Sequence, residues 1–325
     1  MKAATFSRYG APDVVTIAEY PNPVAKSGEV LVRIRATTVS SGDTRIRGLR
    51  MPPGFGWAAR PAFGLFGPRQ PILGTEFAGD VVAVGAGVST FATGDRVFGF
   101  PGIDMKCHAE FRTMPADGRI RHMPENLTYE QAAALSFGGS TALHFLHTVA
   151  KLQAGDRVLV IGASGALGSA AVQIARAAGA HVTGVTSGKN AELVAQLGAH
   201  DVLDYTKSDP FQGGGEWNII FDAVGGLTFR KCESSLGAGG RLILSVAGPG
   251  EMLGSLWAAR GTGKRVVIGS GGERREYLDT LADLVSSGDF LPVIGQTFAF
   301  SDIHKAHAYV DTGRKVGSAV VVLPE

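Results

Sequence analysis

Residues 163–168 form a glycine-rich turn whose spacing suits phosphate binding. They read Ala-Ser-Gly-Ala-Leu-Gly, follow the apolar run VLVIG and open an alanine-rich segment. This order of strand, turn and helix favours a dinucleotide site, in which Gly165 admits a pyrophosphate and Gly168 lets the helix pack on the strand. An ordinary glycine-rich turn is the alternative. The other residues expected at the phosphates, beside the helix N–H groups, are Ser164, Ala166 and Leu167.

The segment VTSGKN, residues 185–190, bears on the choice of dinucleotide. About 20 residues beyond such a turn, an NAD site carries an Asp or Glu that binds the ribose hydroxyls, and this segment has no acid. Ser187 and Lys189 instead offer a hydroxyl and an ammonium to a 2′-phosphate, so the sequence predicts NADPH. A helix N-cap followed by a solvated lysine is the alternative. Tyr205 would reach the same phosphate or pack at a strand end.

A single glutamate, Glu76, stands among small and apolar residues in LGTEFAG, residues 73–79. A buried carboxylate without a partner is costly, so Glu76 needs one. Two pairs of histidines have a helical spacing that can bind metal, but no cysteine or acid pattern completes a site. We therefore expect packing or surface roles for these pairs, which are His144 with His147 and His304 with His307.

The composition indicates a soluble protein of two domains. The chain has 325 residues, of which 45% are hydrophobic, and a formal net charge of +2. Without a basic run, nothing indicates nucleic acid or a membrane surface as a partner. The two cysteines, Cys107 and Cys232, exclude a disulfide scaffold and suit a reducing compartment. No signal-peptide core and no apolar run of the ~18 residues needed for a membrane span is found, so we expect a cytoplasmic location.

The pattern of elements changes at about residue 125. Before it, short strand-like runs such as EVLVRIRATTV and DRVFGF are separated by turn signals. After it, strands alternate with helices, which predicts βαβ units, a parallel sheet and an α/β fold. The last 50 residues or so return to strand, helix and a final strand, GSAVVVLPE.

The whole chain resembles the zinc-free, quinone oxidoreductase-like branch of the medium-chain dehydrogenase/reductase superfamily. Its most specific segments are VSSGDTRIRG, LGTEFAG, AGDRVFGF, GGSTALHFL, GASGALGSAAVQIARAAGA and the strand end FDAVGG. The resemblance implies a GroES-like, mainly-β substrate domain over residues 1–124, completed by 271–325. It also implies a Rossmann domain, a doubly wound parallel sheet, over 125–270, with the active site in the cleft between the two domains.

The metal ligands of the zinc-dependent relatives are missing from this chain. Those relatives place Cys, His and Cys where this sequence has Ser40, Thr75 and Phe137. Zinc requires thiolate, imidazole or carboxylate ligands, so we expect no metal. Glu76 is then expected to accept hydrogen bonds from backbone N–H groups or an arginine, and Asp43 to pair with a nearby arginine.

The resemblance implies an NADPH-dependent, metal-independent reductase of quinones or other conjugated carbonyl compounds. Without a metal, the acceptor must itself be electrophilic, and its oxygen needs hydrogen-bond donors. Ser40 would point at the substrate, and Thr141 would lie near the nicotinamide. Many zinc-free relatives carry asparagine in the slot of Ser40, which leaves quinone specificity open. The other residues expected to line the cofactor are Val224, Val246, Ala247, Ile268 and Gly269.

Two other functions are also compatible with the sequence. One is an alkenal or enoyl reductase without quinone activity. The other is a weakly catalytic NADPH-binding protein of the crystallin or RNA-binding kind, against which the absence of basic clustering argues weakly.

Two further segments carry expectations about partners and substrates. KRVVIGS, residues 264–270, is expected to be the edge strand of the parallel sheet and to join two chains into a homodimer. Residues 50–72 are expected to form a loop whose aromatics either build a lid for bulky apolar substrates or anchor the loop. These aromatics are Phe55, Trp57, Phe63 and Phe66.

Overall fold

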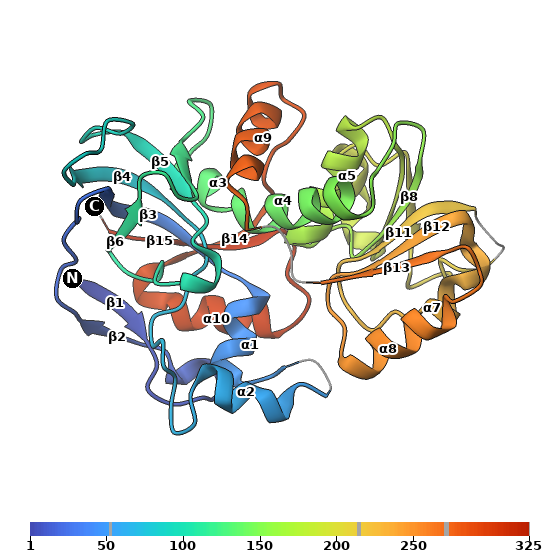
Figure 1. Cartoon of the computed structure of the whole chain (residues 1–325), viewed down its shortest axis with the longest axis horizontal. Coiled ribbons are helices and arrows are strands. Elements are labelled where there is room, and N and C mark those ends of the chain that lie inside the picture. Colours follow the sequence, from blue (N-terminus) through green and yellow to red (C-terminus); the bar gives the residue numbers. More distant parts are fainter. Residues whose placement is uncertain (52–53, 213–215, 270–272, 325) are drawn as a thin grey trace. The chain divides into compact units, whose positions relative to one another are not determined.

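The predicted α/β fold is confirmed, with a mainly antiparallel sheet in one part of the chain and a parallel sheet in another. The computed structural model describes residues 1–51, 54–212, 216–269 and 273–324. The chain divides into two compact units (Figure 1). The first comprises Met1–Met51, Gly56–Phe137 and Glu273–Glu325, and the second comprises Pro52–Phe55 and Gly138–Gly272.

Within the described residues, the first unit is built on a seven-stranded sheet of order β14-β15-β3-β4-β5-β7, in which β6 also pairs with β3. Only β14 and β15 run parallel. A separate ribbon consists of β1 (Lys2–Thr5) and β2 (Thr16–Glu19). The strands of the sheet are β3 (Glu29–Val39), β4 (Phe77–Val84), β5 (Arg96–Gly99), β6 (Phe111–Pro115), β7 (Ile120–His122), β14 (Ile294–Ala299) and β15 (Ser318–Val322).

The period-two pattern of EVLVRIRATTV explains how β3 forms the centre of this sheet. Val30, Val32 and Ile34 are fully buried, and the residues between them are half-buried, as expected for a strand with one face on the core. Helix α10 (Ile303–Asp311) covers that core and packs on β3, β14 and β15. The remaining helical segments of this unit are α1 (Ser41–Gly48), α2 (Gly56–Phe63), α3 (Tyr129–Ala133), α9 (Arg275–Ser286) and the short turns η1 (Pro12–Val14), η2 (Gly102–Asp104) and η6 (Phe300–Asp302).

The first unit extends to Phe137, beyond the expected boundary at residue 124. The cause is α3 (Tyr129–Ala133), which packs on β3 and β4 of the antiparallel sheet. The composition of this segment indicated a helix and therefore a new domain, but the helix packs on the sheet of the first unit.

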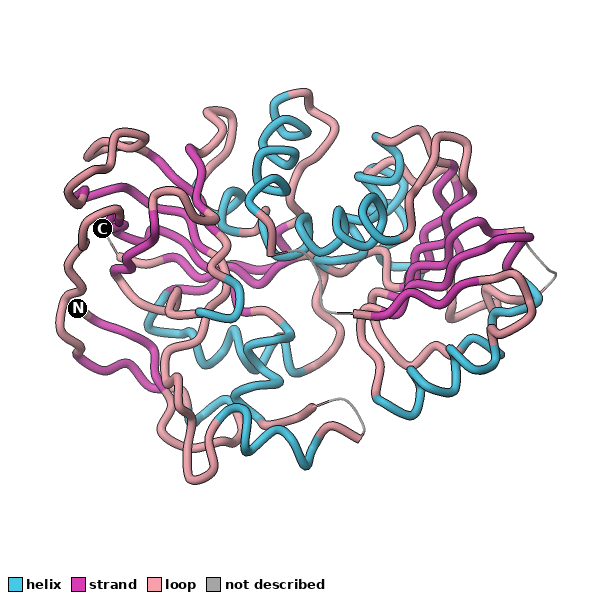
Figure 2. The backbone as a smooth tube through the Cα atoms, in the orientation of Figure 1, coloured by secondary structure: helices cyan, strands magenta, loops and turns pink. Residues whose placement is uncertain are grey.

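The second unit holds a six-stranded parallel sheet of order β10-β9-β8-β11-β12-β13 among its described residues. The chain order reverses between β8 and β11, and α5 lies on the opposite face from α7 and α8 (Figures 1 and 2). The strands are β8 (Arg157–Ile161), β9 (His181–Thr186), β10 (Asp201–Asp204), β11 (Trp217–Asp222), β12 (Leu236–Leu244) and β13 (Arg265–Ile268). The helical segments are α4 (Ser136–Leu143), the π-helical turn η3 (His144–Val149), α5 (Ala166–Ala177), η4 (Gly188–Asn190), α6 (Ala191–Gln196), α7 (Phe229–Cys232), η5 (Glu233–Ser235) and α8 (Pro249–Ala258).

The expected loop over residues 50–72 is wrong in part, because α2 forms at Gly56–Phe63. Its Ala-Ala-Arg sequence has high helix propensity, which outweighs the internal Pro61. Gly64 ends the helix with φ of +133° while its N–H still donates to the Arg60 carbonyl at 2.8 Å. Trp57 is 82% exposed and Phe66 is fully exposed.

Candidate active site

The first N–H groups of α5 have no capping side chain. The chain leaves β8 at Ile161, turns at Gly162 with φ of +77°, and enters α5 after the N-cap Gly165, whose position provides no capping side chain. The first N–H groups of the helix therefore remain available to a ligand. The residues predicted to surround the phosphates are all half-buried, namely Ser164, Gly165, Ala166 and Leu167.

Gly165 and Gly168 serve different purposes. A Cβ on Gly168 would clash with the Gly162 carbonyl oxygen, so close packing of the helix on the turn requires glycine there. A Cβ on Gly165 would meet only that same oxygen, at 3.5 Å, which is an ordinary contact. Internal packing does not demand glycine at 165, and this fits a position that a bound pyrophosphate approaches.

Hydrogen bonds join the turn after β8 to the turn after β9. Thr186 Oγ1 donates to Ser164 Oγ at 2.9 Å, and Asn190 Nδ2 donates to the same oxygen at 3.2 Å. Ser187 is half-buried, whereas the side chain of Lys189 is exposed. Tyr205 is 59% exposed, which removes the alternative of a packed tyrosine, and its N–H donates to the Thr186 carbonyl at 3.2 Å. The three residues predicted at a 2′-phosphate thus belong to one edge of the sheet.

The remaining strand ends of the parallel sheet carry the other predicted cofactor residues. Val224 follows β11, and Val246 and Ala247 follow β12. Ile268 is the last residue of β13, and Gly269 comes directly after it. Because the carboxyl ends of parallel strands share one edge, all five lie at the edge where ligands of such sheets bind. Thr141 is half-buried on α4 of the second unit.

The sequence analysis missed the residue that fixes the first of these loops. Buried Asp222 accepts hydrogen bonds from the N–H groups of Val224, Gly225 and Leu227, at 3.0, 2.9 and 3.1 Å. Its carboxylate therefore holds Val224 in place. The signal was the acid three residues before the first glycine of FDAVGG, a pattern that favours a side-chain-capped turn.

Ser40 and Asp43 form the N-terminal cap of α1 in the first unit. Ser40 Oγ donates to Asp43 Oδ2 at 2.6 Å and accepts from the Asp43 N–H at 3.2 Å. Asp43 Oδ1 accepts from the Gly74 N–H at 2.9 Å. The expected arginine partner of Asp43 is therefore wrong, because the buried arginine nearby, Arg47, pairs with Asp311. The Ser40 hydroxyl must break its hydrogen bond to Asp43 before it can donate to a substrate oxygen.

Glu76 is buried and held by two short hydrogen bonds. Thr38 Oγ1 donates to Glu76 Oε1 at 2.5 Å, and the Phe137 N–H donates to Oε2 at 2.6 Å. The expected backbone N–H partner is confirmed, and a threonine hydroxyl stands in place of an arginine. Burial raises the pKa of Glu76 to about 7, against the opposing effect of these two donors. Burial also lowers the pKa of nearby Lys315, to about 8.

His108, His307 and Cys107 pack in the interior of the first unit. His307 is fully buried with no hydrogen bond to either ring nitrogen among the described residues, and its ring meets that of His108 edge-on at 5.6 Å. Burial holds the pKa of His307 well below its usual range. Burial likewise raises the pKa of Cys107 to about 12. Across the described part of the chain, no three His, Cys, Asp or Glu residues gather as a metal site would require.

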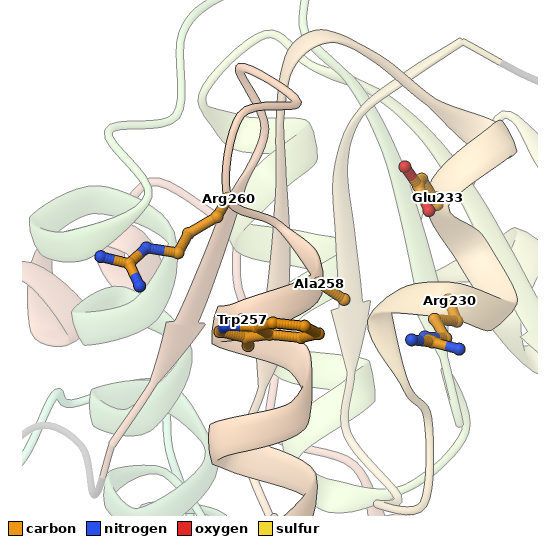
Figure 3. A pocket seen from close by; sticks show the side chains of 5 residues that line it. All are labelled: Arg230, Glu233, Trp257, Ala258 and Arg260. Carbon is orange, nitrogen blue, oxygen red and sulfur yellow. The ribbon is translucent and has the colours of Figure 1, made fainter.

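A cavity of about 730 Å³ lies in the second unit, away from the predicted cofactor edge (Figure 3). Its lining comes from α7, from η5, from the C-terminal end of α8 and from Arg260 just beyond it. These segments precede β12 and β13 in the chain and lie at the amino ends of the strands. It therefore does not belong to the predicted dinucleotide site. The lining residues are Arg230, Glu233, Trp257, Ala258 and Arg260. In the described residues, no helix has the length and apolar character to cross a membrane.

Comparison with known proteins identifies the family. Residues 26–144 match the family described as "Alcohol dehydrogenase GroES-like domain", and residues 197–321 match "Zinc-binding dehydrogenase". A quinone oxidoreductase of Pseudomonas aeruginosa is 30% identical over 99% of this chain and 99% of its own length. The chain belongs to the medium-chain dehydrogenase/reductase superfamily. A second superfamily relative, the mitochondrial NAD(P)H oxidoreductase RTN4IP1 of Mus musculus, is 31% identical over 99% of this chain and 89% of its own length.

Solved structures agree with this family assignment. The quinone oxidoreductase from Coxiella burnetii has a TM-score of 0.86 and 26% identity, covering 100% of this chain and 99% of its own. Mycobacterial Rv1454c, complexed with NADPH, has a TM-score of 0.81 and 27% identity, covering 99% of this chain and 100% of its own. The superfamily and its quinone oxidoreductase-like relatives, predicted from sequence motifs, are confirmed, and the chain is an oxidoreductase. Independence from zinc stays a prediction.

The two glycines of the α5 turn should separate stability from binding. Gly168→Ala should lower the free energy of unfolding by ~1–3 kcal/mol, the usual cost of overpacking. Gly165→Ala should leave stability nearly unchanged and weaken NADPH by roughly tenfold to a hundredfold, since charge-assisted hydrogen bonds would lengthen. Urea unfolding and calorimetric titration measure the two effects. Equal stability losses in both variants would contradict this division.

Buried His307 should make the protein acid-sensitive. The folded state keeps its imidazole neutral, whereas the unfolded state takes up a proton below pH ~6.5, so stability is lost as pH falls through that value. The loss reaches at most ~1.4 kcal/mol per pH unit for one group. In urea unfolding at pH 8 and pH 5, His307→Leu should lose less stability than the parent, while His304→Leu on the same helix should match the parent. A His307→Leu variant as acid-sensitive as the parent would refute this assignment.

Proposed function

We propose that the chain is an NADPH-dependent, metal-independent reductase that transfers hydride to quinones or other conjugated carbonyl compounds. The observation that carries the proposal is the uncapped N-terminus of α5 beside a strand end that offers Ser187 and Lys189 in place of an acid. The superfamily membership and the NADPH complex of one similar structure support it.

The residues of the second unit would bind and orient the cofactor. The α5 N–H groups would hold the pyrophosphate, and Ser187, Lys189 and Tyr205 would hold the 2′-phosphate. The strand-end loops, with Asp222 fixing Val224, would position the nicotinamide near Thr141. Bound NADPH would supply the hydride.

The residue types at the former metal positions favour substrates that need no Lewis acid. Thr75 and Phe137 cannot ligate zinc, and the Phe137 N–H is already committed to Glu76. A conjugated carbonyl spreads the arriving charge onto its oxygen, where a donor such as Ser40 would stabilise it after leaving Asp43.

The exposed aromatics of residues 54–72 favour the lid over the anchor as their role. An anchoring residue would be buried, yet Trp57 and Phe66 are among the most exposed large apolar side chains of the described residues. We therefore propose bulky apolar substrates.

A steady-state assay tests the function. NADPH oxidation should accelerate with a quinone or an enal and survive chelators. Lys189→Ala should raise the KM for NADPH by roughly tenfold to a hundredfold, the value of one charge-assisted hydrogen bond, and spare NADH. The matched control is Lys231→Ala, which removes an ammonium that lies 5.7 Å from the centroid of the Phe211 ring.

The outcomes of this assay discriminate between the candidate functions. Turnover with enals alone identifies an alkenal reductase, and tight NADPH binding without turnover identifies a binding protein. Loss of activity on zinc removal would overturn the metal-independent mechanism.

We also propose a homodimer through β13. This strand pairs with β12 on one side and stands at the edge of the sheet, and an exposed strand edge is a template for pairing with a second chain. Light scattering at micromolar concentration should give twice the 33.8 kDa chain mass. Val266→Pro on β13 should yield monomers, whereas Val202→Pro on the opposite edge strand β10 should leave the dimer intact. A parent chain that is monomeric at this concentration speaks against the proposal.

A further inference from the structure

The turn in residues 185–190 contains no acid in its own sequence, but the fold places an acid from the neighbouring strand beside it. Strands β9 and β10 are parallel, and Asp204 at the end of β10 stands opposite Thr186 at the end of β9. The segment that follows Thr186 is the Ser187–Asn190 turn, where the 2′-phosphate is proposed to bind. The acid is thus supplied by the neighbouring strand.

The carboxylate of Asp204 lies directly against this turn. A Cβ on Gly188 would come within 2.5 Å of Asp204 Oδ2. The other oxygen, Oδ1, accepts from Thr206 Oγ1 at 2.7 Å and from the Thr206 N–H at 3.0 Å. These donors fix the orientation of the side chain, of which only 15% remains exposed.

The same contacts keep Asp204 charged at neutral pH. The hydrogen bond from the Thr206 hydroxyl, followed by that from its N–H, lowers the pKa of the carboxyl, and the Gly188 N–H and Lys207 add to the effect. Lys207 is a weak counter-ion, because its ammonium is 3.9 Å from Asp204 Oδ2 and its side chain is 81% exposed.

An anion at this place acts in opposite directions on the two nicotinamide cofactors. It repels the 2′-phosphate of NADPH, which Lys189 attracts. It is also the group that sites for NADH use to accept hydrogen bonds from the ribose hydroxyls. The turn therefore combines a cation that favours one cofactor with an anion that favours the other.

We propose that Asp204 is a specificity-determining residue that limits the preference for NADPH, so that the chain binds NADH as well. This inference rests on the cofactor site of the proposed function. Like-charge repulsion across a solvated turn is expected to change NADPH affinity by roughly three- to tenfold, and salt should screen it.

Calorimetric titration with NADPH, NADH and the fragment 2′,5′-ADP tests the proposal without turnover. Asp204→Asn keeps an oxygen for Thr206 and should tighten NADPH and 2′,5′-ADP by roughly three- to tenfold at low salt, less at high salt. NADH binding should stay unchanged or weaken. Asp204→Glu retains the charge and should keep the ratio of the parent. Asp201→Asn, at the other end of the same strand, is the matched control.

The outcomes distinguish a failure of the role assigned to Asp204 from a failure of the proposed function. An unchanged NADPH affinity in Asp204→Asn, with a melting temperature like that of the parent, overturns the role of Asp204 alone. A parent chain that binds neither nucleotide overturns the proposed function and this inference with it. Tightening in Asp204→Asn but not in Asp204→Glu or Asp201→Asn supports the inference.

Discussion

The close approach of α5 to the turn after β8 is the constraint on which the candidate site depends. Only a glycine at position 168 lets the helix begin so near the Gly162 carbonyl. That approach fixes the direction of the free N–H groups at the start of α5, and the bonds from Thr186 and Asn190 to Ser164 tie the neighbouring turn to the same place. Packing alone thus determines the geometry of the edge at which the dinucleotide is proposed to bind.

Hydrogen bonds within the first unit satisfy its buried carboxyl groups at Glu76 and Asp43. Glu76 is buried, and its carboxyl accepts hydrogen bonds from the Thr38 hydroxyl and the Phe137 N–H. Ser40 and Asp43 satisfy each other and cap α1. These hydrogen bonds account for polar groups that would otherwise be costly to bury.

Local patterns predicted the fold well, and contacts between distant segments escaped them. Alternation along β3 and the glycine turn before α5 are short-range signals, so the strands and the order of strand, turn and helix at α5 could be predicted. The hydrogen bond from the Gly74 N–H to Asp43 and the position of Asp204 depend on which segments the fold brings side by side, which no single segment encodes. Helix α2 was missed because the prolines and glycines of residues 50–72 obscured its Ala-Ala-Arg sequence, and the domain boundary was misplaced because α3 packs on the preceding sheet.

Hydride transfer from isotopically labelled cofactor tests the central claim most directly. NADPH carrying deuterium on the transferred position of C4 would be reacted with an α,β-unsaturated aldehyde on chelator-treated protein, and the product analysed by mass spectrometry and NMR. The account predicts deuterium on the carbon β to the carbonyl, at an undiminished rate after chelation. Product without deuterium, or transfer that stops when metal is removed and returns with zinc, would contradict it.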